Sequence, residues 1–504
     1  MNLFDNALLF AKETRIKLCE QSFLAFCLWY FGHYITHGFA PMHFGLMSQL
    51  ENDSIEQMVE VIFRGSAKSS LVSTMFVCWN ICYRKRRFII VGSDVKDAAQ
   101  TQMDTIIYEL TENKRILADF GRLFHEEEKE SKDPSKKRKT VGDFITTNDV
   151  RVLMRSVGMK VRGQRYNNIR PELAVMDDPE SIESAESEVK RKKTETWIKN
   201  ELIAGMSQTR MKVVVIGNWL HGDCIVARLC KDPAWKHMKI PIIIDEGKPT
   251  QRLAWPDRYA MTFKEARQRN HAMMAANGGK LEADRRVISI EGLIHKFGTY
   301  VFRREFMLEA ISENEQIIKD YWVHWIDAQA IPRLDDMIIR LYVDPAVSEK
   351  DENDPTAWLV SAYDPRQKRL YFIEAHNERL SLENIKKQTH TIAEYYGGSV
   401  WRPRIEAVSA FDYLCQQLET DFNMMKVKRL NPKGRSKKTR LIASSVSYEK
   451  GQVYLVKGSP EMEELFEQLT KFGKTAHDDL ADVATYSVEE NLLNNKKSRI
   501  HKKK

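Results

Sequence analysis

Two hydrophobic patterns alternate along the first half of the chain. Short apolar, β-branched runs predict buried strands, and runs with an apolar residue every three or four positions predict helices between them. The predicted strands are residues 59–63, 87–93, 171–177 and 212–218, and the predicted helices include 71–83 and 94–110. Strands that alternate with helices form βαβ units, so we expect an α/β domain with a mainly parallel sheet.

The pattern changes in the rest of the chain. Residues 1–50 and 248–335 carry aromatic side chains at helical spacing without strand alternation, so we expect helices there. Strand-like runs at 337–346, 357–363 and 369–374 predict a meander, and 401–407 predicts one more strand. The expected parts are a first domain at 1–247, a connecting segment at 248–335, a second domain with a mixed sheet at 336–490, and a basic tail at 491–504.

The composition is that of a globular protein. The chain has 504 residues, of which 43% are hydrophobic, so it can form two or three domains. Its seven cysteines are scattered, without a C-x-x-C pair or zinc spacing, which argues against disulfides and a structural metal. No run of about eighteen residues is free of charge, and the N-terminus lacks a signal-peptide pattern. We therefore expect a soluble protein that is neither secreted nor membrane-bound.

Positive charge is concentrated in a few runs. The formal net charge is +8, and basic residues cluster at 136–139, 190–193, 426–440 and 496–504. One such run is usually a solvated helix face or a tail, and the charge-dense residues 125–140 predict an exposed loop. Several runs in one chain favour a polyanionic partner such as nucleic acid.

A candidate phosphate-binding loop follows the first predicted strand, with the sequence Arg64-Gly65-Ser66-Ala67-Lys68-Ser69-Ser70. Small residues at such a turn let backbone N–H groups approach phosphates, and the next helix directs its N-terminus at the anion. Lys68 would neutralise the β- and γ-phosphates, and Ser69 would bind Mg²⁺. The G-x-x-x-x-G-K-[ST] pattern is incomplete, because Ala67 replaces the second glycine and Ile62 the first. The alternative is an ordinary strand-to-helix turn with a surface lysine.

The predicted strand at 171–177 ends in a group of carboxylates. Ligands of open α/β sheets lie at the carboxyl ends of the strands, so Asp177 would hold Mg²⁺ through water. Either Asp178 or Glu180 would polarise the attacking water. The alternative is an acidic loop that caps a helix at 181–193. The strand at 212–218 ends in Asn218, whose amide would sense the γ-phosphate.

Acidic residues also end elements of the second domain. Asp344 and Glu406 end two predicted strands, and the run His477-Asp478-Asp479-Leu480-Ala481-Asp482 opens a terminal helix. Such carboxylates suit a ribonuclease-H-like phosphodiester site, in which two metals lie about 4 Å apart. Each carboxylate taken singly is more often a surface or capping residue. Asp478 and Asp479, however, would repel each other without a cation.

These motifs, in this order and over nearly the whole chain, resemble the large terminase subunit of tailed bacteriophages, an ATP-driven DNA-packaging motor with a built-in nuclease. That family has an Arg-Gly-x-x-Lys-Ser loop, which residues 64–69 match except for Ala67 in place of glycine. The strand that ends in Asp177 resembles the Walker B strand, with Asp178 where the family often has glutamate. Asn218 lies where a coupling motif is expected.

The resemblance assigns residues to both sites. The nucleotide would be bound by residues 64–70, Asp177 and Asn218, and Arg64 would also act in catalysis. The nuclease metals would be held by Asp344, Glu406, Asp478 and Asp479, and the catalytic residues there would be Asp344, Glu406 and Asp479. DNA would be bound by Arg435, Lys437, Lys438 and Arg440.

The resemblance also implies cofactors and partners. These are ATP with Mg²⁺ in the first domain, two Mg²⁺ or Mn²⁺ in the second, double-stranded DNA, a small terminase subunit, the portal protein of a procapsid, and a ring of copies of the chain. The implied location is the cytoplasm of an infected bacterial host. Two other classes remain possible: a helicase-like translocase whose C-terminal domain binds DNA without cutting it, and a non-catalytic scaffold. The retained Lys68, Asp177, Asp344 and Asp479 speak against the scaffold.

Overall fold

The computed structural model describes residues 11–124, 142–309, 316–346, 355–407, 411–422, 426–432, 434–475 and 477–493. The chain divides into two compact units, Met1–Ile294 with Val301–Ser312, and His295–Tyr300 with Glu313–Lys504. The predicted loop at 125–140 and the basic runs at 136–139 and 496–504 lie outside the described residues.

The first unit is built on a seven-stranded sheet in the order β3-β4-β2-β5-β6-β1-β7. Only β3 runs antiparallel to its neighbour, so the predicted mainly parallel sheet is confirmed. Strands β2, β5 and β6 are buried along their whole length, as their continuous apolar runs predicted. In sheet order, the bounds are β3 (Asp143–Ile145), β4 (Arg151–Ser156), β2 (Phe88–Ser93), β5 (Leu173–Asp177), β6 (Lys212–Ile216), β1 (Gln57–Ile62) and β7 (Lys236–Ile240).

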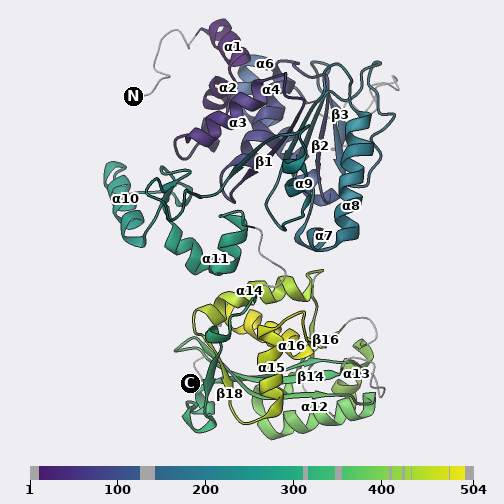
Figure 1. Ribbon diagram of the computed structural model, residues 1–504, viewed down its shortest axis with the longest axis vertical. Helices are drawn as coiled ribbons and strands as arrows, with labels where there is room; N and C mark the ends of the chain where they lie inside the picture. Colours follow the sequence, from purple (N-terminus) through teal and green to yellow (C-terminus); the bar gives the residue numbers. More distant parts are fainter. Residues whose placement is uncertain are drawn as a thin grey trace. The chain divides into compact units, whose positions relative to one another are not determined.

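Helices cover this sheet (Figure 1). The N-terminal segment is helical as expected, and Phe23 packs on Phe76 and Trp79 with ring centroids 5.5 and 5.3 Å apart. The predicted helix at 181–193 is two helices instead, because Ser187 ends the first and its side chain accepts the Lys190 N–H to begin the second. The main helices are α1 (Lys12–Gln21), α2 (Phe23–Tyr30), α3 (Pro41–Glu51), the π-helix η3 (Ser70–Phe76), α4 (Val77–Cys82), α5 (Lys96–Glu112), α6 (Lys114–Phe120), α7 (Ile182–Glu186), α8 (Glu188–Trp197) and α9 (Ile225–Lys231).

Residues 248–335 contain short strands as well as helices. The helices are α10 (Phe263–Ala276) and α11 (Ile290–Glu305). A two-stranded antiparallel sheet joins β8 (Ile243–Ile244) to β9 (Arg252–Leu253), and a parallel one joins β10 (Tyr259–Ala260) to β11 (Ile288–Ser289). The segment also contributes the three-residue strand β12 (His324–Ile326) to the sheet of the second unit. The expectation of helices without strands was therefore wrong here, because strands of two or three residues are too short to leave a periodic pattern.

The second unit is built on a seven-stranded sheet in the order β12-β18-β15-β14-β13-β16-β17, and its mixed character was predicted. Strands β13, β14 and β15 form the antiparallel meander, and the other pairs are parallel. The bounds are β12 (His324–Ile326), β18 (Val453–Val456), β15 (Arg369–Glu378), β14 (Thr356–Asp364), β13 (Ile338–Asp344), β16 (Arg404–Glu406) and β17 (Lys428–Leu430).

Helices lie on both faces of this second sheet (Figure 1). One face packs Leu341 and Trp358 against Ile385 and Leu414 of α12 (Leu382–Tyr396) and α13 (Asp412–Asp421). The other face contacts α15 (Pro460–Thr470) and α16 (Asp479–Val488), and α14 (Lys437–Glu449) packs on α16. Within the described parts of the chain, no helix combines the length and the apolar character needed to cross a membrane.

The central strand β1 contains a buried acid. Glu60 is 0% exposed, and neither of its carboxyl oxygens has a hydrogen-bond partner among the described residues. Burial raises the pKa of Glu60 to about 9, against a smaller opposing effect of Lys236. The folded protein therefore holds Glu60 protonated at neutral pH, whereas the unfolded chain ionises it.

We expect Glu60→Gln to flatten the dependence of stability on pH. Because the folded state binds the extra proton, Glu60 lowers stability progressively between about pH 4.5 and pH 9, by about 3 kcal/mol at pH 7. Melting temperatures measured from pH 5 to pH 9 should fall less in Glu60→Gln than in the wild type. The exposed control Glu13→Gln should follow the wild-type curve. Equal slopes for Glu60→Gln and the wild type would mean that Glu60 is not the buried acid described here.

Candidate nucleotide and metal sites

The loop between β1 and η3 has the shape of an anion cradle. Gly65 has φ 84° and Ala67 has φ 65°, so two alternate residues lie in the left-handed region. Such alternation directs successive backbone N–H groups to one side, where they bind anions. The conformation favours glycine at both positions, and it costs Ala67 about 1 kcal/mol. Ala67 therefore has a conformation that glycine adopts more readily, at the position where the family pattern has glycine.

Side chains from outside the loop hold this shape. His43 Nε2 donates to Ser66 O at 2.9 Å, while His43 Nδ1 accepts the Ala40 N–H at 2.9 Å. This pairing requires neutral imidazole, and burial lowers the pKa of His43 accordingly. Tyr259 donates its hydroxyl to Gly65 O at 3.1 Å. The structure thus adds Tyr259, which no motif in the sequence indicated.

The predicted nucleotide-binding side chains meet at the carboxyl ends of β1, β5 and β6. Lys68, which is 6% exposed, donates to Ile62 O at 3.0 Å and to Asn218 Oδ1 at 2.8 Å. Asp177 accepts from Ser69 at 3.3 Å and from Ser73 at 2.9 Å. Burial, and then the neighbouring Asp178, raise the pKa of Asp177 to about 6. A lysine, a serine hydroxyl and a carboxylate in this order suit a phosphate and its Mg²⁺.

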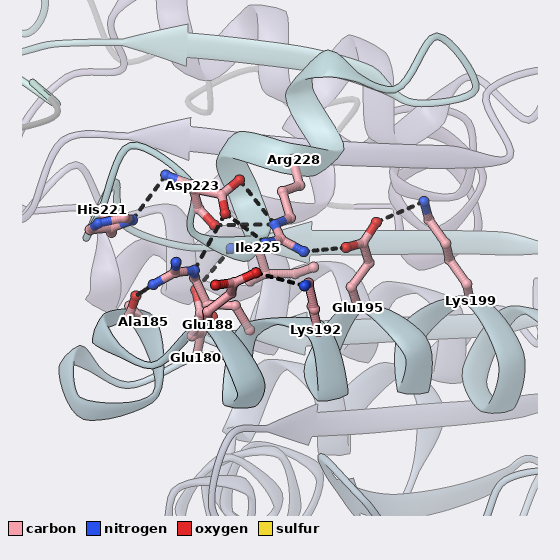
Figure 2. Close-up of polar contacts among 11 residues, drawn as sticks. Glu180, Ala185, Glu188, Lys192, Glu195, Lys199, His221, Asp223, Ile225 and Arg228 are labelled. Carbon is pink, nitrogen blue, oxygen red and sulfur yellow. Dashed lines mark hydrogen bonds and ion pairs between the residues drawn. The ribbon is translucent and has the colours of Figure 1, made fainter.

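The two candidates for water activation lie in different surroundings. Asp178 is exposed, has φ 46°, and lies 3.5 Å from the Asn218 amide. Glu180 is 5% exposed, and its Oε2 accepts the Ile225 N–H at the start of α9 at 2.8 Å (Figure 2). Burial raises the pKa of Glu180 to about 7 and also raises the pKa of Asp178, so accessibility and hydrogen bonding, not the direction of the pKa shift, distinguish the two. Glu180 therefore serves as an anchor for α9, and Asp178 offers the more accessible carboxylate.

Ion pairs between α8 and α9 reinforce that anchor (Figure 2). Asp223 lies 3.5 Å from Arg191 and 2.6 Å from Arg228, and Arg228 also contacts Glu195 at 2.5 Å. Arg191 donates to Ala185 O at 2.6 Å, which joins the preceding helix to the network. These contacts hold the start of α9, whose Ile225 N–H is the group that Glu180 binds.

A cavity of about 600 Å³ opens beside the loop. Its volume is in the range of small-molecule sites. The lining residues are 64–70 from the loop together with Ser93, Asp94, Val95, Ala98, Asp178, Glu180, Ser181, Ile182, Asn218, Leu220 and Glu305. Arg64 Nη1 contacts Glu305 Oε2 at 2.5 Å, and Arg64 N donates to Glu305 O at 3.0 Å. Glu305 was not found from the sequence, because it lies 241 positions from Arg64 and carries no motif.

Three acidic residues meet in the second unit. Asp344 ends β13, Glu406 ends the parallel neighbour β16, and Asp482 lies on α16, with one oxygen of each within 4.8 Å of the others. We call Asp344, Glu406 and Asp482 the acidic triad. Burial, and then Glu406 and Asp482, raise the pKa of Asp344 well above its ordinary range. The triad contains two of the predicted ligands, but its third member, Asp482, was not singled out.

The predicted pair Asp478 and Asp479 lies beside the triad. Lys437 Nζ is 2.7 Å from Asp478 Oδ1, 3.2 Å from Asp479 Oδ1 and 3.9 Å from Asp482 Oδ2. The repulsion expected between the two aspartates is thus offset by a lysine. Asp479 and Asp482 are three positions apart on one helix and share a side of it, which is why the sequence did not distinguish them.

The four predicted DNA-binding residues differ in exposure. Arg440 is only 2% exposed, contacts both Asp482 oxygens at 2.7 and 2.8 Å, and lies over the Tyr486 ring. Its prediction as a DNA-facing residue is corrected, because a buried guanidinium cannot reach a phosphate. Arg435 is exposed and pairs with Glu489 at 3.0 Å, and Lys437 and Lys438 are partly exposed. For these three residues DNA binding stays a prediction.

The known proteins that resemble this chain are found by structure. No family model matches it, and no curated protein matches its sequence. The large terminase of a thermophilic bacteriophage aligns with 90% of this chain and 99% of its own, with a TM-score of 0.52 and 10% identity. The complex of that terminase with ATP-γ-S aligns over the same shares at 10% identity with a TM-score of 0.51.

At this identity the likeness bears on the fold. The parallel sheet with a phosphate-loop turn and the mixed sheet of the second unit define a P-loop domain followed by a ribonuclease-H-like domain. This combination is the fold of large terminases, and the resemblance found in the sequence is confirmed at that level.

We expect Arg440→Met to lower the free energy of unfolding by about 3 kcal/mol, because it removes the close partner of the buried Asp482 and leaves only Lys437, at 3.9 Å. The control is Arg366→Met, whose side chain is 79% exposed and lies 3.8 Å from Asp336. It should change stability by less than about 0.5 kcal/mol. Denaturant unfolding of the two variants would measure the difference. Equal stabilities would mean that Arg440 is not the buried partner of Asp482.

Proposed function

We propose that this protein is the large subunit of a viral DNA-packaging motor, which hydrolyses ATP to move double-stranded DNA into a procapsid and cuts concatemeric DNA with a metal-dependent nuclease. The observation that carries the proposal is the presence, in one chain of large terminase fold, of a preformed phosphate loop and an acidic triad. Either feature alone has other uses. Together they combine hydrolysis of a nucleotide with phosphodiester cleavage.

ATP hydrolysis is assigned to the cavity of the first unit. Lys68 would bind the β- and γ-phosphates and leave its present partner Asn218, which is then free to report the state of the γ-phosphate. Ser69 and Asp177 would hold Mg²⁺, and they already form one hydrogen-bonded pair. Bound Mg²⁺ would offset the negative charge that develops on the phosphates. Arg64 would also offset the negative charge on the phosphates, once its ion pair with Glu305 is broken.

Asp178 is the group that we assign to water activation. It is exposed at the cavity, whereas one Glu180 oxygen is committed to the Ile225 N–H. A general base must reach the proton that it abstracts, so accessibility decides between two carboxylates of the same loop. Glu180 then has a structural task at α9.

DNA cleavage is assigned to the acidic triad. Asp344, Glu406 and Asp482 come from three elements and bring their oxygens within 4.8 Å, as a shared divalent cation requires. A bound Mg²⁺ or Mn²⁺ would activate water and stabilise the leaving oxygen. Among the described residues, this is the group of carboxylates with such spacing. The triad supports cleavage over the alternative of a translocase that binds DNA without cutting it.

Partners and location follow from the same proposal. The net charge of +8 and the exposed Arg435 suit the DNA backbone. A small terminase subunit, a portal protein and a ring of copies of this chain are the proposed assembly. The proposed location is the cytoplasm of an infected bacterial host.

We expect Asp178→Asn to lower the rate of ATP hydrolysis by at least about 100-fold, because the amide cannot accept the proton of the attacking water. Glu180→Gln should stay within about tenfold of the wild type, since its amide oxygen still accepts the Ile225 N–H. Phosphate release in the presence of Mg²⁺, ATP and DNA would measure both rates. Lys68→Ala provides the inactive reference, and the exposed control Lys264→Ala should keep full activity. The opposite order of the two acidic variants would assign catalysis to Glu180.

We expect Asp344→Asn to abolish DNA cleavage and to leave ATP hydrolysis unchanged. An amide cannot replace the charge that holds a divalent cation, but its loss relieves repulsion with Glu406 and Asp482. The melting temperature without metal should therefore hold or rise. Plasmid cleavage in Mg²⁺ and in Mn²⁺, read beside thermal melts, tests both parts. The exposed control Asp336→Asn should still cut. Undiminished cutting by Asp344→Asn in either metal would remove the triad from the mechanism.

A further inference from the structure

The carboxylates near the nuclease triad fall into two groups that share one residue. Asp344, Glu406 and Asp482 bring their oxygens together, and Asp478, Asp479 and Asp482 surround the ammonium of Lys437. Asp482 belongs to both groups. A two-ion centre has its metals about 4 Å apart with a carboxylate between them. The group of Asp478, Asp479 and Asp482 therefore lies next to the triad, as the ligands of a second metal ion would. The ammonium of Lys437 occupies the space between these carboxylates.

We propose that Lys437 takes the place of the second metal ion, so that this centre binds one divalent cation, in the triad, and uses the lysine as a fixed positive charge beside it. The proposal rests on the nuclease function proposed above and concerns the composition of its site. It replaces the two-metal expectation that the fold family raised.

The position of Lys437 is set by the backbone. It is the first residue of α14, whose Ser436 cap accepts the Thr439 N–H at 3.1 Å. Arg440 lies one turn further along α14 and forms an ion pair with Asp482. Lys437 and Arg440 therefore approach the same carboxylate from one helix. Helix α14 and the Arg440–Asp482 ion pair thus hold the Lys437 ammonium near the triad.

Lys437 stays charged in this position. Its side chain is 38% exposed. Oxygens of Asp478, Asp479 and Asp482 lie 2.7, 3.2 and 3.9 Å from its Nζ, so the ammonium has a negative partner on several sides. A tethered ammonium loses no translational freedom when a substrate binds, whereas a second metal ion would have to be captured from solution. The remaining exposure lets the ammonium contact a DNA phosphate by charge alone, without proton transfer.

The test counts Mn²⁺ ions bound by the full-length chain without nucleotide. Calorimetry gives the number of ions, and electron paramagnetic resonance reports whether two Mn²⁺ ions are close enough to couple. The proteins are the wild type, Lys437→Gln and Lys437→Arg. Each is measured with and without Asp482→Asn, which removes the carboxylate that both groups share, and the difference excludes ions bound elsewhere. Thermal melts confirm that each variant is folded.

We expect one Asp482-dependent ion in the wild type and in Lys437→Arg, with no coupled signal, because both keep a cation in the second group. Lys437→Gln should bind two Asp482-dependent ions and give the coupled spectrum. Two Asp482-dependent ions in the wild type, or one in a folded Lys437→Gln, would overturn the proposal while leaving the nuclease site in place. Absence of any Asp482-dependent ion would overturn the metal centre itself, and the role of Lys437 with it.

Discussion

Parallel pairing of neighbouring strands brings their carboxyl ends to one edge of a sheet, and both sites of this protein depend on that constraint. In the first unit β1, β5 and β6 deliver the loop, Asp177 and Asn218 to a common edge. In the second unit β13 and β16 do the same for Asp344 and Glu406. Residues more than a hundred positions apart in the first site are thereby brought within hydrogen-bond distance. The chemistry of each site follows from the direction in which its strands run.

The sequence predicted those features that leave a local pattern. The strand ending in Asp177 and the strand ending in Asp344 were located because apolar runs before a carboxylate are distinctive. Partners such as Glu305 and Tyr259 were not, since each contacts the loop from a distant part of the sequence and belongs to no motif. Their identity depends on tertiary packing, which a single sequence does not encode locally.

Two errors in the second unit have a common cause. A run of basic or acidic residues gives the composition of a helix end, but not the direction in which each side chain points. Arg440 is buried although its neighbours are partly exposed, and Asp482 joins the triad although Asp479 opens the same helix. Helical geometry separates such residues by about 100° per position. The packing of α14 on α16 buries Arg440, whereas Asp479 and Asp482 are both buried and differ in that Asp482 lies beside Asp344 and Glu406.

The left-handed backbone of Ala67 bears on nucleotide affinity. Glycine would adopt this shape without strain, but it would also leave the loop many other shapes in the unfolded and unbound states. With alanine, the cradle depends on its surroundings, namely the His43 and Tyr259 contacts to the flanking carbonyls. The loop is therefore preorganised before any ligand arrives. Its conformational entropy is lost when the protein folds and not when a ligand binds. A nucleotide then meets a site whose affinity is not reduced by that loss.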